Sequence, residues 1–466
     1  MEGIIKGKSI RLPARASLWY VGTSVITKAV GVLVTPIFTR LLTGTEYGAY
    51  SLYMSYLGLF SVICTASFSS GVIYKGFQKF SNKKESFLSA ALGFSLSFCV
   101  IICALLFVFN SLLGLGYALT ALLCIQLIAD TSVGLALMRE RYAYRYMTVV
   151  LVGVFESVAA PLISLILLFG TGESFVCRLW GLLIPAVIAA TPLVKEILRR
   201  SSRLYDGDIW KYLIRRCAPL FPSVFSGAVS SQAGNLILVA ALGHDALAKY
   251  SITHSIGIGL LFVVSSLGAA LGPWITRKIA AGRIDTVREV GGLLFTLLGA
   301  ATVFLVAIVP EALSFLAPPE YAEAIAAALP IALATLPSFI TSIGSVGLIF
   351  AERGGSVSAA SILGAGANIL FSFLLIPRLI YLGAGLALLL SNLFSALVTI
   401  LFLRQAGLGK IVSTARALAI FTVTALLGVL TALLYEYAAL RILLLILPAL
   451  VIVRSAFSAK ELISEI

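Results

Sequence analysis

Three charged side chains lie deep inside long apolar stretches of this sequence, where a membrane would surround them. Lys28 is near the middle of the first stretch, Glu156 is near mid-depth of the fifth, and Asp130 lies towards one end of the fourth. A charge at the centre of a spanning helix costs on the order of 3 kcal/mol, so it faces a partner or a water-filled cavity. These three residues are therefore the first candidates for function.

Each of the three charges has two chemical interpretations. Lys28 can attract an anionic headgroup such as a pyrophosphate, or it can form a structural ion pair with a buried acid such as Glu156. Glu156 can bind and release a proton, which ion-coupled transport requires, or it can serve as the partner of Lys28. Asp130 is a second ion-coupling candidate, with a structural pairing to nearby Arg139 or Arg141 as the favoured alternative.

Further polar and aromatic groups fall within the predicted helices. Gln232 and Asn235, at mid-depth of the seventh helix, can hydrogen-bond sugar hydroxyls or join neighbouring helices. His254 is a weaker candidate for proton coupling, because a lone His is more often structural. Tyr53 and Tyr56 can stack on sugar faces from within the second helix.

Arg178 begins the sixth helix at its outer end. Its guanidinium can guide an anionic group outwards, and snorkelling to the membrane interface is the alternative. The candidate substrate-binding residues are thus Lys28, Tyr53, Tyr56, Arg178, Gln232 and Asn235, and the ion-coupling candidates are Asp130, Glu156 and His254.

The composition requires a membrane around these residues. The chain is 60% hydrophobic and 12% charged, with a mean hydropathy of +1.06, which indicates a polytopic all-α membrane protein. The net charge of +14 does not indicate nucleic acid, because the basic residues recur between apolar segments. No cofactor or metal site is expected, and the N-terminus lacks a signal-peptide pattern. The cysteines have neither metal-ligand nor disulfide spacing; they are Cys64, Cys99, Cys103, Cys124, Cys177 and Cys217.

Apolar runs of spanning length predict about fourteen transmembrane helices. Their approximate ranges are 17–39, 47–73, 86–109, 112–138, 147–169, 175–195, 218–242, 248–275, 288–310, 323–350, 356–376, 380–403, 412–434 and 438–456. The Lys and Arg residues alternate in step with this assignment and place both termini in the cytoplasm. The few basic residues on the outer side are Arg40, Arg178, Lys249, Arg378 and Arg441.

The helices are expected to form two six-helix halves, 1–194 and 218–403, followed by two additional helices in 404–466. An amphipathic cytoplasmic connector, 195–217, joins the halves and is expected to lie at the anionic membrane surface. A shift of 200 residues aligns 42–60 with 242–260 and matches Leu, Tyr and two Ser residues. This weak repeat predicts two halves of equal orientation.

The stretch TRLLTGTEYGAYSLYMSYLGLFS (39–61), followed by SFSSGVIYKG (67–76), resembles the start of polysaccharide flippases of the MOP exporter superfamily. These Wzx-like transporters of O-antigen and capsule units are related to lipid II flippases and MATE exporters. The resemblance implies alternating-access export of an undecaprenyl-pyrophosphate-linked oligosaccharide across the bacterial plasma membrane. It also implies a cationic site, which maps onto Lys28, a possible H⁺ or Na⁺ coupling, and a polysaccharide polymerase as a possible partner.

Three other functions are alternatives to this one. A MATE-type drug or cation antiporter would favour acidic groups such as Glu156, and a lipid II flippase would carry a different glycan. A membrane glycosyltransferase or polymerase needs a sizeable loop with catalytic acids. The most substantial outer link, 310–324, is short and has no convincing acid–base pair, so an enzyme is not expected.

Overall fold

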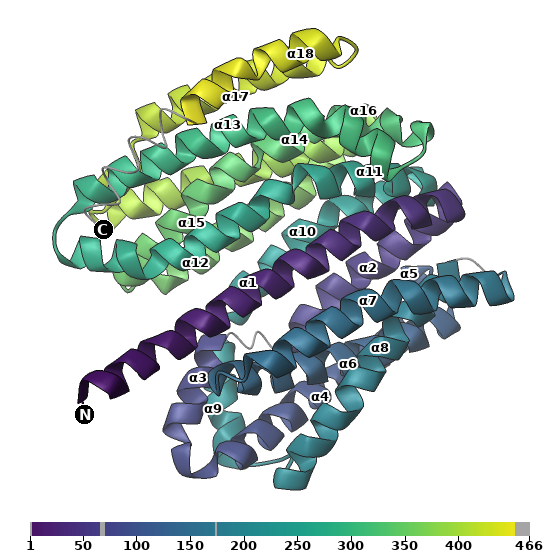
Figure 1. Ribbon diagram of the computed structural model, residues 1–466, viewed down its shortest axis with the longest axis vertical. Coiled ribbons are helices and arrows are strands. Elements are labelled where there is room, and N and C mark those ends of the chain that lie inside the picture. The colour runs from purple at the N-terminus through teal and green to yellow at the C-terminus, as the bar shows by residue number, and fades with distance from the viewer. Residues whose placement is uncertain (1, 66–69, 173–174, 453–466) are drawn as a thin grey trace. The chain divides into compact units, whose positions relative to one another are not determined.

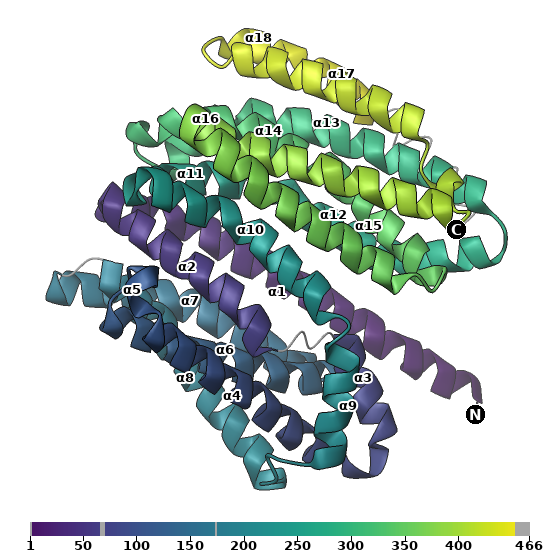
Figure 2. The ribbon, with the colours of Figure 1, turned by 180° about the vertical axis from the view of Figure 1, so that it is seen from behind.

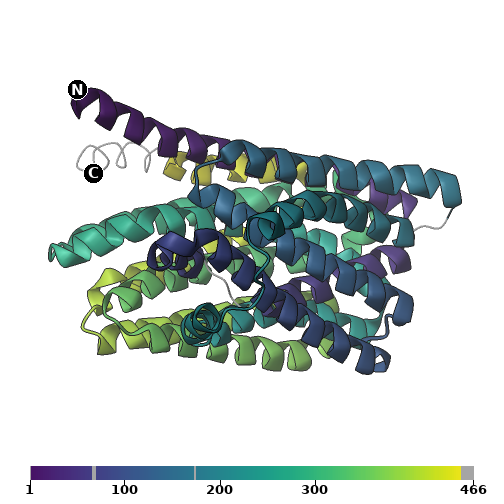
Figure 3. The same cartoon turned by 90° about the horizontal axis from the view of Figure 1, so that it is seen from below.

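The computed structural model describes residues 2–65, 70–172 and 175–452, and every regular element in these ranges is a helix. Helices are the structures expected, because a chain crossing lipid must satisfy its own backbone hydrogen bonds. The chain divides into two compact units at Ala228 and Val229, within one helix. Most long helices of each unit run roughly parallel or antiparallel to one another (Figure 1, Figure 2, Figure 3).

Unit 1 contains the first nine α-helices and the start of the tenth. They are α1 (Glu2–Leu41), α2 (Gly44–Cys64), α3 (Ser70–Lys79), α4 (Lys84–Val108), α5 (Asn110–Leu113), α6 (Tyr117–Tyr142), α7 (Tyr146–Thr171), α8 (Phe175–Arg200), α9 (Gly207–Cys217) and α10 (Phe221–Leu242), with a 3₁₀ turn at Ser81–Lys83. The helices α6, α7 and α8 pack together, and α1 packs along α7.

Unit 2 contains the remaining helices. They are α11 (His244–Gly257), α12 (Gly259–Ala280), α13 (Ile284–Leu316), α14 (Ala328–Leu333), α15 (Thr335–Phe350), α16 (Gly354–Gln405), α17 (Thr414–Leu433) and α18 (Ala438–Leu444), with 3₁₀ helices at Pro319–Ala327 and Gly409–Ile411. Helix α17 lies along α13 in both views (Figure 1, Figure 2). The additional C-terminal pair therefore packs on this unit.

Ten described helices are long and apolar enough to cross a membrane. Four further elements correspond to the other predicted segments. They are α2, the pair α11 and α12, which is bent by 43°, the second half of α16, and the apolar helical segment Ala438–Ile452, which begins with α18. Each of the fourteen predicted segments thus has a helical counterpart among the described residues; residues 66–69 of the segment 47–73 and 453–456 of the segment 438–456 lie outside them. The prediction of a polytopic all-α membrane protein is confirmed.

Helix α16 is a hairpin of two antiparallel helices. At Ile380 the backbone has φ 51° and ψ −120°, which no helix accommodates. Asn368 Nδ2 donates to Ser391 Oγ at 3.0 Å, and a Cβ at Gly364 would lie 3.0 Å from Ser395 Cβ. These contacts are centred on Ile380, which separates the two helices predicted as 356–376 and 380–403.

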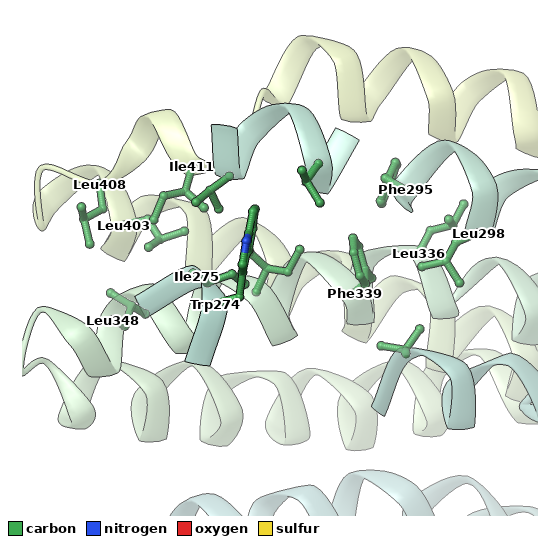
Figure 4. Close-up of a cluster of buried hydrophobic side chains, with 14 of the residues drawn as sticks. Trp274, Ile275, Phe295, Leu298, Leu336, Phe339, Leu348, Leu403, Leu408 and Ile411 are labelled. Atoms are coloured by element: carbon green, nitrogen blue, oxygen red, sulfur yellow. The ribbon is translucent and has the colours of Figure 1, made fainter. Parts of the chain in front are cut away.

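A large apolar cluster holds the helices of unit 2 together. Trp274, Phe295, Leu336, Phe339 and their neighbours are buried between α12, α13, α15 and α16 (Figure 4). Since lipid is as apolar as these side chains, close packing rather than water exclusion favours the contact.

The predicted repeat has a local structural counterpart in each unit. Helices α2 and α11 begin at residues 44 and 244, so they start 200 positions apart. The Ser55 hydroxyl donates to the Ser51 carbonyl at 2.9 Å, and Ser255 makes the same bond to Ser251 at 2.8 Å. Their N-termini differ: Thr43 and Glu46 form a reciprocal capping box before α2.

The predicted connector is more firmly attached than a membrane-surface tether. Helix α8 continues to Arg200, and Asp206 caps α9 by accepting from the backbone of Ile209 at 3.2 Å. The apolar face of α9, with Ile209, Tyr212, Leu213 and Cys217, is buried in a cluster with α3 and α4 of unit 1. The connector is thus part of the core of unit 1, because its apolar face packs on protein.

Candidate functional site

The acids predicted from sequence come together inside unit 1. Asp130 on α6 and Glu156 on α7 lie near enough for their charges to interact. Gln126, one turn before Asp130, donates from Nε2 to Asp130 Oδ1 at 2.8 Å. Gln126 is 5% exposed, and its own Oε1 has no hydrogen-bond partner within the described residues. The Asp130 carboxyl and the unsatisfied Gln126 amide oxygen make this part of unit 1 rich in hydrogen-bond acceptors.

Close contacts between helices hold the acidic pair in place. A Cβ at Gly181 on α8 would lie 1.9 Å from Ser164 Oγ and 2.7 Å from the Ala160 carbonyl oxygen on α7. Nearer the start of α7, the Thr23 methyl carbon on α1 lies 3.2 Å from where a Cβ would stand at Gly153. Small residues therefore let α7 approach both neighbours, as in other membrane helix interfaces.

The tyrosines of α2 lie within the packing of unit 1. Tyr53 is 1% exposed, and its hydroxyl group is close enough to Asp130 for an electrostatic interaction. Tyr56 donates its hydroxyl to the Leu113 carbonyl at 3.2 Å and stacks on Phe60 with ring centres 6.1 Å apart. Their stacking on a sugar stays a prediction.

Arg178 is held between two aromatic rings. Its guanidinium carbon lies 4.1 Å from the centre of the Phe38 ring and 5.4 Å from that of Tyr50. Its Nη1 donates a long hydrogen bond of 3.4 Å to Ser164 Oγ. Cation–π contacts orient the guanidinium inside unit 1, where snorkelling to the interface was the alternative expectation.

The remaining candidate residues lie on three other helices, α1, α10 and α11. Lys28 is exposed on α1. In α10, Asn235 donates from Nδ2 to Gln232 Oε1 at 3.4 Å, so the two amides share one face of the helix. His254 is half-buried beside Tyr250, with ring centres 5.4 Å apart, in the last turn before the bend between α11 and α12.

The expected pairing of Asp130 with Arg139 or Arg141 is wrong. Arg139 lies nine residues further along α6, at its cytoplasmic end, where its Nη2 contacts Glu140 Oε1 at 2.7 Å and Glu196 Oε1 at 3.0 Å. The Arg141 guanidinium lies 6.0 Å from the centre of the Tyr20 ring. The prediction relied on nearness in the sequence. In the structure, Arg139 pairs instead with glutamates that include Glu196 on α8, which is far away in the sequence.

Arg139 is the centre of an ion cluster that joins α4, α6 and α8. Besides its two close glutamates it lies 3.9 Å from Glu85, and Arg200 contacts Glu85 at 3.3 Å and Glu196 at 2.8 Å. The Arg139 side chain is 13% exposed and that of Glu140 is 5% exposed. This cluster fixes the cytoplasmic end of unit 1.

We expect Arg139→Ala to lower the free energy of unfolding by about 3 kcal/mol, because it leaves the buried Glu140 carboxylate without its closest cation. Arg145→Ala is the matched control: this side chain is 60% exposed and lies 4.0 Å from Glu140, so its loss should cost under about 1 kcal/mol. Equilibrium unfolding of the purified proteins in a detergent titration measures both. Equal stability of the two variants would show that the cluster contributes nothing.

In the part of the chain that the structure describes, no group of three or more His, Cys, Asp or Glu residues is arranged to hold a metal ion.

Gln126 was missed by the sequence interpretation. It precedes Asp130 by four residues, which places both on one face of a helix, and a Gln with an acid at this spacing forms a hydrogen bond. That spacing was the signal that would have found it.

Comparison with known proteins decides the family. The model of the family described as polysaccharide biosynthesis protein matches residues 14–278, which is more than half of the chain. The chain belongs to this polysaccharide biosynthesis protein family. The match begins within α1 and ends within α12. It therefore includes Lys28, Asp130, Glu156, Arg178, the α10 amides and His254. A search of curated proteins finds no match.

Several solved structures share the fold of this polysaccharide biosynthesis protein. The lipid II flippase MurJ in an inward closed conformation superposes with a TM-score of 0.70 at 13% identity, covering 96% of this chain and 99% of that one. An inward-facing multidrug resistance MATE transporter of the MOP superfamily gives 0.64 at 13% identity, covering 85% and 96%. A MOP superfamily transporter from Pyrococcus furiosus, described as having a binding pocket of reversed polarity, gives 0.59 at 15% identity, covering 88% and 96%.

The family match confirms the predicted relationship to polysaccharide biosynthesis proteins, and the solved structures show that this chain shares its multi-pass membrane fold with MurJ and with transporters of the MOP superfamily. Coverage of nearly the whole chain includes the two C-terminal helices. The named neighbours are transporters and a flippase rather than enzymes.

Proposed function

We propose that this protein is a flippase for lipid-linked oligosaccharides. It moves undecaprenyl-pyrophosphate-linked glycan units from the cytoplasmic to the outer leaflet of a bacterial plasma membrane by alternating access. The observation that carries the proposal is the family match over residues 14–278 together with a fold shared over 96% of the chain with a lipid II flippase.

The basic candidates supply the chemistry for an anionic headgroup. Lys28 offers a positive charge within an apolar helix, and the pyrophosphate of the substrate carries the complementary charge. Arg178, oriented by the Phe38 and Tyr50 rings, offers a second. The paired amides of Gln232 and Asn235 have the donors and acceptors that sugar hydroxyls need.

The acidic pair supplies ion coupling. A proton or Na⁺ bound by Asp130 and Glu156 cancels one of two interacting negative charges. Binding and release then change the charge between α6 and α7, which can favour one conformation of unit 1 over another. His254, beside the bend between α11 and α12, is kept as a weaker candidate.

The same acidic pair favours the second candidate function, a MATE-type cation or drug antiporter, in which the acids would contact the exported cation. A lipid II flippase differs from the first proposal only in its glycan. A polysaccharide polymerase stays the proposed partner, since it would consume the exported units.

Deletion of the gene distinguishes the functions. We expect surface polysaccharide to disappear, lipid-linked glycan to accumulate on the cytoplasmic face, and drug susceptibility to stay unchanged, with full recovery on complementation. Immunoblotting of the surface glycan and drug-sensitivity assays measure the two effects. Altered drug resistance with intact surface glycan would favour the antiporter.

A further inference from the structure

A basic depression lies on the surface of unit 1 where α3 meets α9. Four cations line it, Lys79 at the end of α3 and Lys211, Arg215 and Arg216 on α9, and its volume is about 630 Å³. That volume falls in the range of small-molecule binding sites.

Two aromatic rings form the apolar lining of the depression. Phe80 and Tyr212 meet edge to face with ring centres 5.6 Å apart, and the Tyr212 hydroxyl donates to the Val72 carbonyl at 3.4 Å. Lys79 Nζ lies 4.9 Å from the Tyr212 ring centre and 5.5 Å from that of Phe80. The rings are fixed by the core of unit 1, so the site is built before any ligand arrives.

The charges in the depression are not balanced. Among the described residues that line it, Asp208 is the one acid, against four cations. Among the described residues, no carboxylate lies within 4.0 Å of the Lys79, Lys211, Arg215 or Arg216 side-chain nitrogens. An excess of positive charge on a fixed apolar lining fits a ligand with a phosphate group attached to an apolar body.

The depression lies where a membrane surface is expected. Helix α9 stands between the cytoplasmic end of the spanning helix α8 and the start of the spanning helix α10. Next to Arg215, the Ile214 side chain is 54% exposed although it is apolar. A helix segment with exposed apolar and basic side chains side by side is typical of the lipid headgroup layer.

We propose that this depression binds the phosphate headgroup of an anionic phospholipid from the cytoplasmic leaflet. Lys211, Arg215 and Arg216 contact the phosphate, the Phe80 and Tyr212 rings contact the glycerol backbone, and Ile214 lies among the acyl chains. The bound lipid ties α9, and through it the core of unit 1, to the membrane surface. The site is independent of the proposed transport substrate.

Binding of short-chain lipids to the full-length protein in an uncharged detergent tests the proposal. Dioctanoyl-phosphatidylglycerol is the probe, dioctanoyl-phosphatidylcholine is the uncharged comparison, and a short polyprenyl pyrophosphate represents the substrate headgroup. We expect the double variant Lys211→Gln/Arg215→Gln to bind phosphatidylglycerol about thirtyfold more weakly than the wild type, at about fivefold for each charge removed.

The control is Arg283→Gln/Lys410→Gln, which removes two exposed charges elsewhere. Its affinity for phosphatidylglycerol should stay within about twofold of the wild type. Equal weakening in both variants means that net charge alone attracts the lipid, and it overturns the proposal. So does unchanged phosphatidylglycerol binding in the first variant, or a loss confined to polyprenyl pyrophosphate.

Cys217 reports whether α9 remains docked in the variants. It is 3% exposed, and burial raises the pKa of its thiol to about 11, so at pH 8 it should react slowly with iodoacetamide. Peptide mapping by mass spectrometry measures that labelling. If Cys217 is no longer protected in Lys211→Gln/Arg215→Gln, the variant Lys79→Gln/Arg216→Gln is tested in its place. We again expect phosphatidylglycerol binding to weaken about thirtyfold, and the same results would overturn the proposal.

Discussion

Replacement of Lys28 by Ala should reduce surface glycan by at least about tenfold and leave lipid-linked glycan on the cytoplasmic face. A charge-assisted contact to a pyrophosphate contributes about 1.5–3 kcal/mol, which corresponds to roughly ten- to a hundredfold in binding. Quantitative immunoblotting in a complemented deletion strain, at matched expression, measures the loss.

Membrane insertion cannot account for such a loss. Removing a Lys from an apolar helix lowers the cost of insertion by about 3 kcal/mol, so the variant should insert at least as well as the wild type. Ser24→Ala, one turn earlier and also exposed, should keep normal surface glycan, and Lys28→Arg should keep most of it. Normal surface glycan in Lys28→Ala would remove this residue from the mechanism.

Glu156→Gln should abolish the pH dependence of transport and lower its rate at least about tenfold when a proton gradient drives it. The amide keeps the shape of the side chain but cannot take up a proton. Transport of a fluorescent lipid-linked glycan in proteoliposomes of controlled internal and external pH measures both effects.

The interaction between Glu156 and Asp130 makes a sharper test possible. If the two acids act as one proton-binding unit, Asp130→Asn should have a similar effect, and the double variant should be no worse than either single one. Effects that multiply would indicate two independent roles. Glu156→Gln protein that transports normally, with an unchanged pH profile, would end the coupling hypothesis.

Some of this organisation could be predicted because it depends on local sequence. Apolar run length predicted the helices and the short breaks near Ile380 and residues 434–437, since a chain in lipid can only span as a helix. The break predicted at residues 110–111 lies instead at 114–116, after the short helix α5. Lys28, Asp130 and Glu156 were recognisable because charge inside an apolar run is rare. The shared helix starts at 44 and 244 follow the repeat visible in the sequence.

Other features depend on which helices meet. The rings around Arg178 come from α1 and α2, while Arg178 itself is on α8, so no local spacing predicts them. The glutamates around Arg139 likewise come from three different helices, so local spacing does not predict this cluster either. The amphipathic pattern of α9 predicted an apolar face but not whether lipid or protein covers it.

The sequence alone thus determined the fold class, the spans and the rare charges within them, since the cost of placing polar groups in lipid acts residue by residue. Only the tertiary structure decided the partners of those charges. The structure pairs Asp130 with Gln126 by a hydrogen bond and places Asp130 within electrostatic range of Glu156. It pairs Arg139 with glutamates at the cytoplasmic end and packs α9 on the core of unit 1. Such pairings depend on helix contacts between residues far apart in the chain, which hydropathy does not encode.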